Sequence, residues 1–361
     1  GLVAAIGVVP FVFGSITGGL QSSSDIKQQY FYRIFSTNTI KERLLFWQNS
    51  IEMFWEHPFG VGIGNWPIHF PKYGLEKFGS FEIQNGLHTL QRPHNDFLGV
   101  LCETGILGFA AFVFIVGMVV YQLVSLIRTA PTQQERQMFV YLLSAVIGFV
   151  VIAFFDFPME RIEHQVILFL LFAIVIDQYR KSGKSGFTCS VSKKWLGLFV
   201  AVGICLSLTI AFRRLQSERE AYDMQLARKN SNTKEVLWCA RQAENNFFKI
   251  DANTMPLKWY EGTTYFAGGE FSKSERCFTA AFALTPYNIN VINNLASCYE
   301  VSGKRDDAIE MYAKALQISP RFEEARLNLA AVYFNKKAFD KAFETIDRCA
   351  IDTRDAKYKT F

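Results

Sequence analysis

Paired cysteines are missing from this chain of 361 residues, although seven cysteines are present. Six of the seven fall in two regions: Cys102 and Cys205 lie in apolar stretches, and a polar C-terminal region contains Cys239, Cys277, Cys298 and Cys349. This spacing matches neither a disulfide framework nor a zinc motif. We therefore expect the cysteines to be small buried hydrophobic residues.

A secretory leader is also missing from the start of the sequence. The apolar run from Gly1 to Leu20 has no basic residues before it and no small-residue cleavage pattern, so it is not interpreted as a signal peptide. Because the first residue is Gly and not Met, we expect the chain to begin within a longer protein, in or just before a membrane helix. Residues 1–20 are accordingly predicted to be a partial transmembrane helix.

Long apolar runs are what the sequence does have. Half of the residues are hydrophobic, and they concentrate in the first 212 positions. Four runs follow the first one and are long enough, or nearly so, to cross about 30 Å of hydrocarbon as helices: 97–127, 138–157, 166–176 and 195–212. They lack the alternation of membrane β-strands. The fold class is therefore all-α, with four transmembrane helices in 97–212.

The basic residues predict the orientation of these helices. Seven Lys and Arg side chains fall in two connecting loops, 128–137 and 179–194, whereas the turn between those loops carries Arg161 alone. Basic loops stay in the cytoplasm. The opposite side would then hold a long loop, 21–96, and the C-terminal region, 213–361.

The C-terminal region repeats itself with a period of 34 residues. Tyr265, Tyr299 and Tyr333 recur at this interval, and the clearest unit reads NVINNLASCYEVSGKRDDAIEMYAKALQISP. This pattern resembles the tetratricopeptide repeat, in which stacked helix pairs form a continuous core and a concave surface. A weaker unit is predicted around 220–251. The concave face would bind a protein or peptide partner, or the array would be a spacer or cap on the membrane domain, and both interpretations stay open.

The 21–96 loop opens with Gln/Ser-rich turn residues, and a predicted amphipathic helix follows at about 39–56. Its large apolar residues share one broad face at helical spacing: Leu44, Trp47, Ile51, Phe54 and Trp55. Such a helix is suited to lying on membrane lipids with its aromatic side chains among the headgroups. Arg43 is one turn before Trp47, close to this face.

A glycine-rich stretch, HPFGVGIGNW, follows this helix. Gly60, Gly62 and Gly64 alternate, which would let backbone N–H groups approach a phosphate. A plain turn explains the same residues. The stretch is not a dinucleotide-binding fingerprint, because no strand precedes it.

The end of the loop reads LQRPHNDFLGVLCETGILGF and concentrates ionisable residues. Arg92 and His94 come just before a membrane span, and Asn95 or Asp96 can cap its helix. Glu103 lies about two turns further on, where a charged side chain is expected to face a polar cavity or the membrane edge. A second polar cluster lies in FFDFPMERIEHQ between two spans: Asp156, Arg161, Glu163 and His164. These charges are either solvated or complete a site that faces the long loop.

Together, these pieces resemble the O-antigen ligase and polymerase family of bacterial inner-membrane proteins. The resemblance runs from about Ile40 to Asp177, and the PHNDFL and ETGILG segments are its most specific part. It implies transfer of a glycan from undecaprenyl diphosphate to an acceptor, without a metal or other cofactor, at the periplasmic face of a multi-pass inner-membrane protein.

The resemblance also suggests roles for individual residues. Arg43 and Arg92 would hold the diphosphate, since a guanidinium keeps its charge and matches phosphate oxygens. His94 would act as the base that activates the acceptor hydroxyl. Six further residues, three of them glycines, are predicted to bind substrate: Gly60, Gly62, Gly64, Asn95, Glu103 and Trp47.

Several functions remain open at this stage. The acceptor would be lipid A–core, as in O-antigen ligases, a protein side chain, as in O-oligosaccharyltransferases, or a growing polymer. A membrane-anchored repeat scaffold without enzymatic activity explains the C-terminal region, but it leaves Arg43, the glycines and His94 unexplained. A flippase would require more charges within the spans. Other expected partners are membrane lipids and a protein at the repeats, and no nucleic acid is expected.

Overall fold

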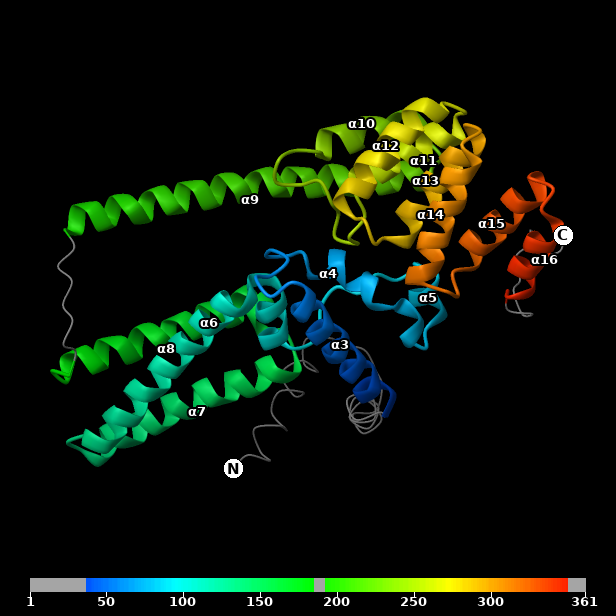
Figure 1. Cartoon of the computed structure of the whole chain (residues 1–361). Helices are drawn as coiled ribbons and strands as arrows, with labels where there is room; N and C mark the ends of the chain where they lie inside the picture. Colours follow the sequence, from blue (N-terminus) through cyan, green and yellow to red (C-terminus); the bar gives the residue numbers. More distant parts are fainter. Residues whose placement is uncertain (1–36, 185–191, 350–361) are drawn as a thin grey trace, which may run out of the picture. The chain divides into compact units, whose positions relative to one another are not determined.

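A computed structural model describes residues 37–184 and 192–349, and every regular element in these two ranges is a helix (Figure 1). The predicted helix 1–20 lies outside the described residues. The chain divides into two compact units, 1–48 and 49–361. Helix α3 (Thr37–Glu56) crosses the boundary between these units and confirms the helix predicted at 39–56.

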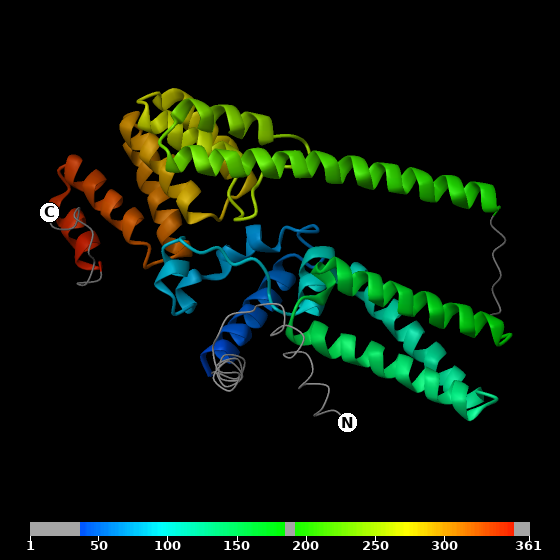
Figure 2. The ribbon, with the colours of Figure 1, turned by 180° about the vertical axis from the view of Figure 1, so that it is seen from behind.

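Within the described residues, four helices are long and apolar enough to cross a membrane, as the sequence predicted. They are α6 (Asp96–Thr129), α7 (Gln133–Phe155), α8 (Ile162–Lys181) and α9 (Lys193–Lys229). The first three pack side by side, as the two opposite views in Figures 1 and 2 show. Their shared core contains Leu123, Val146 and Leu168, whereas most of their other apolar side chains are exposed, as expected for helices that face lipid.

Contacts between loops identify which helix ends lie together. Lys184, which follows α8, donates to the carbonyl and the hydroxyl of Ser125 near the end of α6, each at 3.0 Å. The two basic loops are thus neighbours, as the charge pattern requires. Near the start of α6, Asp96 accepts a 2.8 Å hydrogen bond from the backbone N–H of Met159 in the α7–α8 turn.

Helix α9 joins the membrane helices to the repeats without a break. Its last third packs against α10 (Thr233–Ala243), with Ala221, Met224 and Ala240 in their common core. The boundary predicted at residue 213 therefore lies inside one continuous helix. The weak unit predicted around 220–251 corresponds to this α9–α10 pair and the turn after it.

Three further helix pairs form the repeats proper. They are α11 (Leu257–Ala267) with α12 (Phe271–Leu284), α13 (Ile289–Val301) with α14 (Arg305–Ile318), and α15 (Glu323–Asn335) with α16 (Phe339–Asp347). The small residues Ala281 and Ala315, 34 positions apart, are fully buried where the helices touch. Gly269 and Gly303 turn the chain within their pairs at φ of 74° and 80°. The repeat architecture is confirmed.

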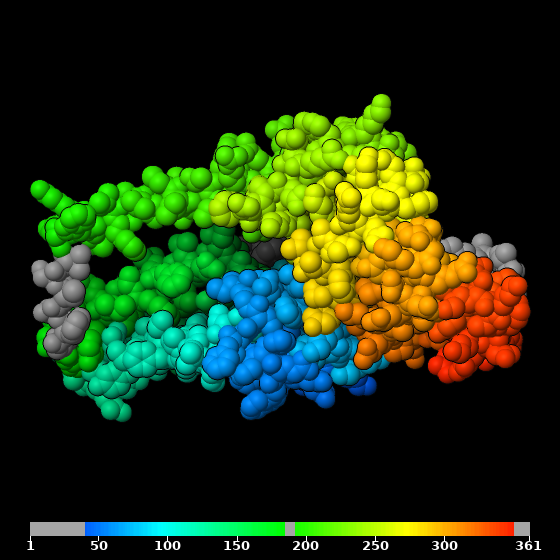
Figure 3. All heavy atoms as spheres, turned by 45° about the horizontal axis from the view of Figure 1, so that its top comes forward, coloured from blue at the N-terminus to red at the C-terminus, as the bar shows by residue number. Residues whose placement is uncertain are grey.

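The long loop contains short elements that pack against the repeats. These are α4 (Trp66–His69), the 3-10 turns η1 (Phe70–Tyr73) and η2 (Leu75–Lys77), and α5 (Phe81–Gln84). Leu75 belongs to the same buried cluster as Ile292, Tyr312 and Phe322 of the array. In Figure 3 the blue loop surface accordingly meets the yellow and orange surface of the repeats.

The apolar face predicted for the first loop helix is only partly right. Leu44, Ile51 and Trp55 are exposed, as a membrane-facing stripe requires, but Phe54 is buried. The buried side of α3 also contains polar residues: the Asn49 side chain donates to the carbonyl of Tyr73 at 3.2 Å. Periodicity could not reveal this, because the partner lies 24 residues away.

Candidate functional site

The glycine-rich stretch is docked against a break in α6. Gly105 has φ of 68° and ψ of −173° inside this helix. The carbonyls of Cys102 and Glu103, just before the break, accept hydrogen bonds from the N–H groups of Val61 (3.0 Å) and Gly62 (2.9 Å). The loop thus satisfies backbone groups that an interrupted helix would leave without partners.

The N–H groups of two of these glycines already have partners within the protein. The N–H of Gly60 donates to the carbonyl of His57 at 2.8 Å, and the N–H of Gly62 is taken by Glu103. Gly60, Gly62 and Gly64 have φ between 79° and 96°, where other residues are strained. The glycines therefore build a tight turn in which the N–H groups of Gly60 and Gly62 bind carbonyls. The predicted role of the three glycines in binding substrate stays a prediction.

Glu103 has a protein partner in the loop. Its carboxylate accepts the backbone N–H of Trp66 at 3.1 Å, at the start of α4. Trp66 is buried, donates its indole N–H to the Ser50 hydroxyl at 3.1 Å, and stacks on Phe70. Glu103 was predicted to face a polar cavity or the membrane edge, and this contact shows that it fastens the loop to α6. Its predicted role in substrate binding stays a prediction.

Two adjacent residues begin α6 in different ways. The side chain of Asn95 accepts the N–H of Leu98 at 3.0 Å and is the N-cap of the helix, one of the two options that the sequence left open. The Asp96 carboxylate instead accepts the backbone N–H of Met159, which lies between α7 and α8. His94, the residue before the cap, has the left-handed φ of 52°, which is unusual for a residue other than glycine.

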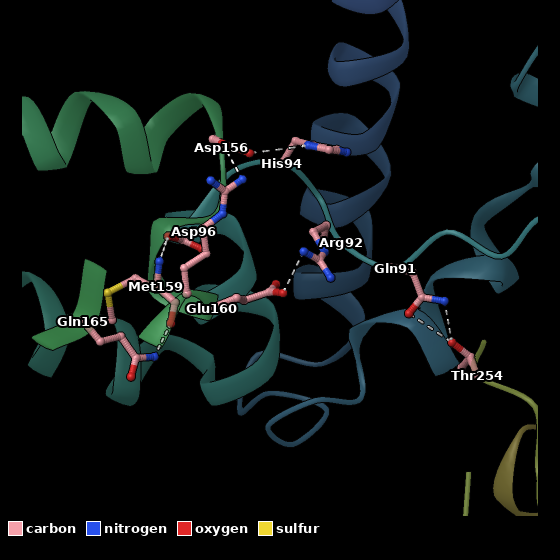
Figure 4. Close-up of polar contacts among 10 residues, drawn as sticks. Gln91, Arg92, His94, Asp96, Asp156, Met159, Glu160, Gln165 and Thr254 are labelled. Atoms are coloured by element: carbon pink, nitrogen blue, oxygen red, sulfur yellow. Dashed lines mark hydrogen bonds and ion pairs between the residues drawn. The ribbon is translucent and has the colours of Figure 1, made fainter. Parts of the chain in front are cut away.

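The α7–α8 turn meets the end of the loop in a cluster of charged and aromatic side chains, whose ion pairs Figure 4 shows. Arg92 forms an ion pair with Glu160 at 3.1 Å, and its guanidinium lies 4.1 Å from the ring centre of Phe157. His94 Nδ1 is 4.0 Å from Asp156 Oδ1, and its ring contacts Phe157 edge-on. The structure therefore brings Arg92 and His94 together with the turn whose charges the sequence singled out.

The electrostatics of this cluster centre on Glu160. Burial raises the pKa of the Glu160 carboxyl, and the neighbouring Arg92 opposes that rise only in part. Arg92 and His94 remain about one-third exposed, so a ligand can reach both side chains. Arg161, the second arginine of the cluster, lies in the turn and pairs with Asp156 at 3.4 Å. An anionic ligand would thus enter a site whose cations already have carboxylate partners.

Glu160 and Phe157 were not predicted to take part in the site. Both lie inside FFDFPMERIEHQ, so the signal was present as an acidic residue and an aromatic residue beside the predicted charges. A turn between two spans does not by itself reveal which loop residue it meets. Only the fold pairs Glu160 with Arg92, which is 68 positions earlier in the chain.

Arg43 and Trp47 belong to the first compact unit. They lie one helical turn apart on α3, as the sequence predicted. Their participation in one site with Arg92 and His94 stays a prediction.

Comparison with known proteins agrees with these features. Residues 1–113 match the family model described as O-Antigen ligase, and residues 302–361 match the tetratricopeptide repeat model. The resemblance to the O-antigen ligases is confirmed for residues 1–113. This ligase region includes the glycine-rich stretch, Arg92, His94 and the break in α6. The match supports a glycan-transfer function in that family, and the repeat match agrees with the helix pairs of the array.

Curated proteins with partial similarity share a short region only. The peroxisomal targeting signal receptor of Candida albicans is 30% identical over 115 residues, which are 32% of this chain and 19% of the receptor. The Hsp70-Hsp90 organizing protein 1 of Glycine max is 26% identical over 85 residues, 24% of this chain and 15% of that protein. The chain thus spans less than one-fifth of these relatives. Among solved structures, MamA is 19% identical, with a TM-score of 0.32, over 35% of this chain and 71% of MamA.

Proposed function

We propose that this protein transfers a glycan from undecaprenyl diphosphate to an acceptor at the periplasmic face of the bacterial inner membrane. The observation that carries the proposal is the meeting of Arg92 and His94 with the α7–α8 turn, beside the ends of three apolar helices. A lipid carrier would lie in the membrane with its diphosphate at this level. The repeats contact the same loop and would share its side of the membrane.

Arg92 is the residue proposed to bind the diphosphate. Its guanidinium lies over the ring of Phe157, and its charge is compensated by Glu160. A diphosphate carries more negative charge than one carboxylate, so it would compete with Glu160 for the guanidinium donors. Arg92 would stabilise the charge that develops on the leaving diphosphate. The same role is proposed for Arg43 of the first unit on the resemblance to the ligase family alone.

His94 is proposed as the general base. The acceptor hydroxyl oxygen attacks the anomeric carbon of the glycan, the bond from that carbon to the diphosphate oxygen breaks, and its electron pair stays on the diphosphate. The hydroxyl proton moves to an imidazole nitrogen of His94. Asp156, 4.0 Å from Nδ1, would stabilise the imidazolium that forms.

The acceptor defines the alternatives within this activity. A lipid A–core acceptor makes the protein an O-antigen ligase, a protein side chain makes it an O-oligosaccharyltransferase, and a growing glycan makes it a polymerase. The repeats favour a protein among the partners, since such arrays bind protein segments on their concave face. A repeat scaffold without activity is the alternative of a different class.

The test is complementation of cells that lack the protein. His94→Ala is expected to reduce glycan transfer at least about 100-fold, the usual contribution of a general base. Arg92→Ala is expected to reduce it by a similar factor, about 100-fold, through lost stabilisation of the leaving group. Both variants should let lipid-linked glycan accumulate. His88→Ala, an exposed histidine in the same loop, is the matched control. Normal transfer by both variants at normal protein level would refute the proposal and favour the scaffold. The molecule that loses its glycan in the deletion strain identifies the acceptor.

A further inference from the structure

A tight turn between α10 and α11 presents one threonine of the repeat region to the loop. Asp251 organises this turn: its Oδ1 accepts the N–H groups of Asn253 (2.8 Å) and Met255 (3.0 Å). Its Oδ2 accepts the Tyr260 hydroxyl at 2.6 Å, and that hydroxyl accepts the amide of Gln225 on α9 at 2.7 Å. The turn is therefore tied to two helices of the array.

Thr254, at the tip of this turn, is held in a costly conformation. Its φ is 61°, a left-handed value that a β-branched residue rarely adopts, and it is buried. Such strain persists only where the surrounding contacts over-determine it, and it concentrates at functional positions. A glycine would adopt this backbone conformation with less strain. The conformation therefore does not explain why a threonine is present at this position.

The Thr254 hydroxyl contacts the residue that precedes Arg92. The Gln91 side-chain amide donates to Thr254 Oγ1 at 3.1 Å, and Thr254 Oγ1 lies 3.4 Å from the Gln91 amide oxygen (Figure 4). Next to it, the Thr89 hydroxyl donates to the carbonyl of Asn253 at 3.0 Å. Two side chains of the loop are thus bonded to the turn immediately before the proposed site.

Other repeats hold the preceding part of the same segment. The Asn290 amide donates to the carbonyl of Gly86 at 2.8 Å, and the Ser319 hydroxyl donates to the carbonyl of Gln84 at 2.6 Å. The N–H of Glu323, in the first turn of α15, donates to the Asn85 side chain at 3.1 Å. The segment 84–91 is therefore attached to three successive parts of the array before it reaches Arg92.

We infer that Thr254 is a positioning residue: through Gln91 it sets the place of Arg92 for the diphosphate of the lipid carrier. The inference rests on the proposed function of Arg92. The array is then part of the site. The turn between α10 and α11 positions Arg92, which is the loop residue of the ion pair with Glu160. A partner bound to the repeats would be able to alter transfer through this contact.

Thr254→Gly tests this role, because it removes the hydroxyl and also relieves the backbone strain. We expect a thermal unfolding midpoint no lower than that of the wild type, yet amide hydrogen exchange in 86–94 about tenfold faster, as loss of one well-formed hydrogen bond implies. Binding of undecaprenyl diphosphate by the detergent-purified full-length protein should weaken several-fold. Ser231→Gly is the control: it also removes a hydroxyl at positive φ (55°), at an exposed turn of the array.

Gln91→Ala gives an independent check from the loop side. The double variant Gln91→Ala/Thr254→Gly should bind undecaprenyl diphosphate no more weakly than the weaker single variant, because both remove one interaction. Wild-type exchange and wild-type affinity in Thr254→Gly overturn the inference. Arg92→Ala separates the two proposals: if it also binds the lipid normally, the proposed function fails, and if it loses binding while Thr254→Gly does not, only the positioning role fails.

Discussion

Gly60 lies directly against Gly105, and neither position has room for a side chain. A Cβ on Gly60 would be 2.6 Å from the backbone nitrogen of Gly105, and a Cβ on Gly105 would be 2.7 Å from the nitrogen of Gly60. Backbone therefore packs on backbone where the loop meets the broken helix α6. This contact places the loop near the start of α6, at a position 11 residues after His94 and 13 after Arg92 in the chain.

Gly60→Ala and Gly105→Ala are each expected to destabilise the protein by roughly 1–3 kcal/mol, the usual cost of overpacking, in addition to the cost of their left-handed conformation, because the new methyl group overlaps fixed backbone. Thermal unfolding in detergent measures this. Gly64→Ala is the matched control, because Gly64 also has a positive φ (79°) but open space around it. It should cost only about 1 kcal/mol for the left-handed conformation. Equal losses in all three variants would show that conformation, and not close packing, requires the glycines.

Glu160→Gln should make the binding of undecaprenyl diphosphate less dependent on pH. In the wild type the Glu160 carboxylate competes for Arg92, and burial raises its pKa above the usual value of 4.5. Protonation of Glu160 as the pH falls towards that pKa releases Arg92. The variant should therefore bind about fivefold more tightly at pH 7.5, equal to roughly 1 kcal/mol for a partly exposed ion pair, with a smaller difference at pH 5.

Both proteins are measured with the same lipid, so protonation of the ligand cancels in the comparison. Weaker binding by Glu160→Gln at pH 7.5 would contradict this prediction. It would show that Glu160 orients Arg92 and does not merely compete with the ligand.

Acid should loosen the loop near His69. Burial lowers the pKa of the His69 imidazole, and the nearby His57 and Lys72 lower it further. In the unfolded chain histidine titrates near pH 6.5. The neutral form is favoured in the folded state, so stability is present above this pH and is lost as the pH falls through the folded pKa.

Hydrogen exchange of 66–78 is therefore expected to accelerate between pH 7.5 and 5.5, after correction for the intrinsic rate. His69→Gln should remove part of this change. His57 and Tyr287, whose rings lie 5.5 and 5.8 Å from His69, are the aromatic groups that face it. His88→Gln, at an exposed position of the loop, should keep the wild-type response, and an unchanged response in His69→Gln would assign the effect to another group.

Transfer is expected to need no metal ion, as the resemblance to the ligase family implies. Purified protein dialysed against EDTA should keep its rate on lipid-linked glycan and the acceptor found in cells. A loss that Mg²⁺ or Mn²⁺ restores would refute this expectation. The same assay without protein, with and without Mg²⁺, controls for the effect of the ion on the diphosphate substrate.

The array cannot simply be deleted to distinguish an enzyme from a scaffold. Leu75 is buried in the core of the repeats, and 84–91 is bonded to them, so deletion after residue 215 would expose the loop as well as remove a binding surface. Point variants on the array, such as Thr254→Gly, leave this core in place.

Local sequence alone determined the helices. Apolar runs of sufficient length predicted the four membrane spans, since hydrocarbon thickness sets the length of a spanning helix. The period of 34 predicted the helix pairs, because each pair must bury one face on the next. Asn95, one of the two residues predicted to cap α6, is its N-cap. A cap can be predicted from local sequence because its side chain bonds to the first turn of the same helix.

The contacts that build the site were decided by the tertiary structure. Glu103 binds Trp66, Arg92 pairs with Glu160, and Gln91 meets Thr254 across 37, 68 and 163 positions of the chain. Periodicity reports which face of a helix is apolar, but it carries no information about which distant polar group satisfies a side chain. The glycines show the same limit: their spacing predicted an unusual backbone, and only the break in α6 showed what that backbone packs against.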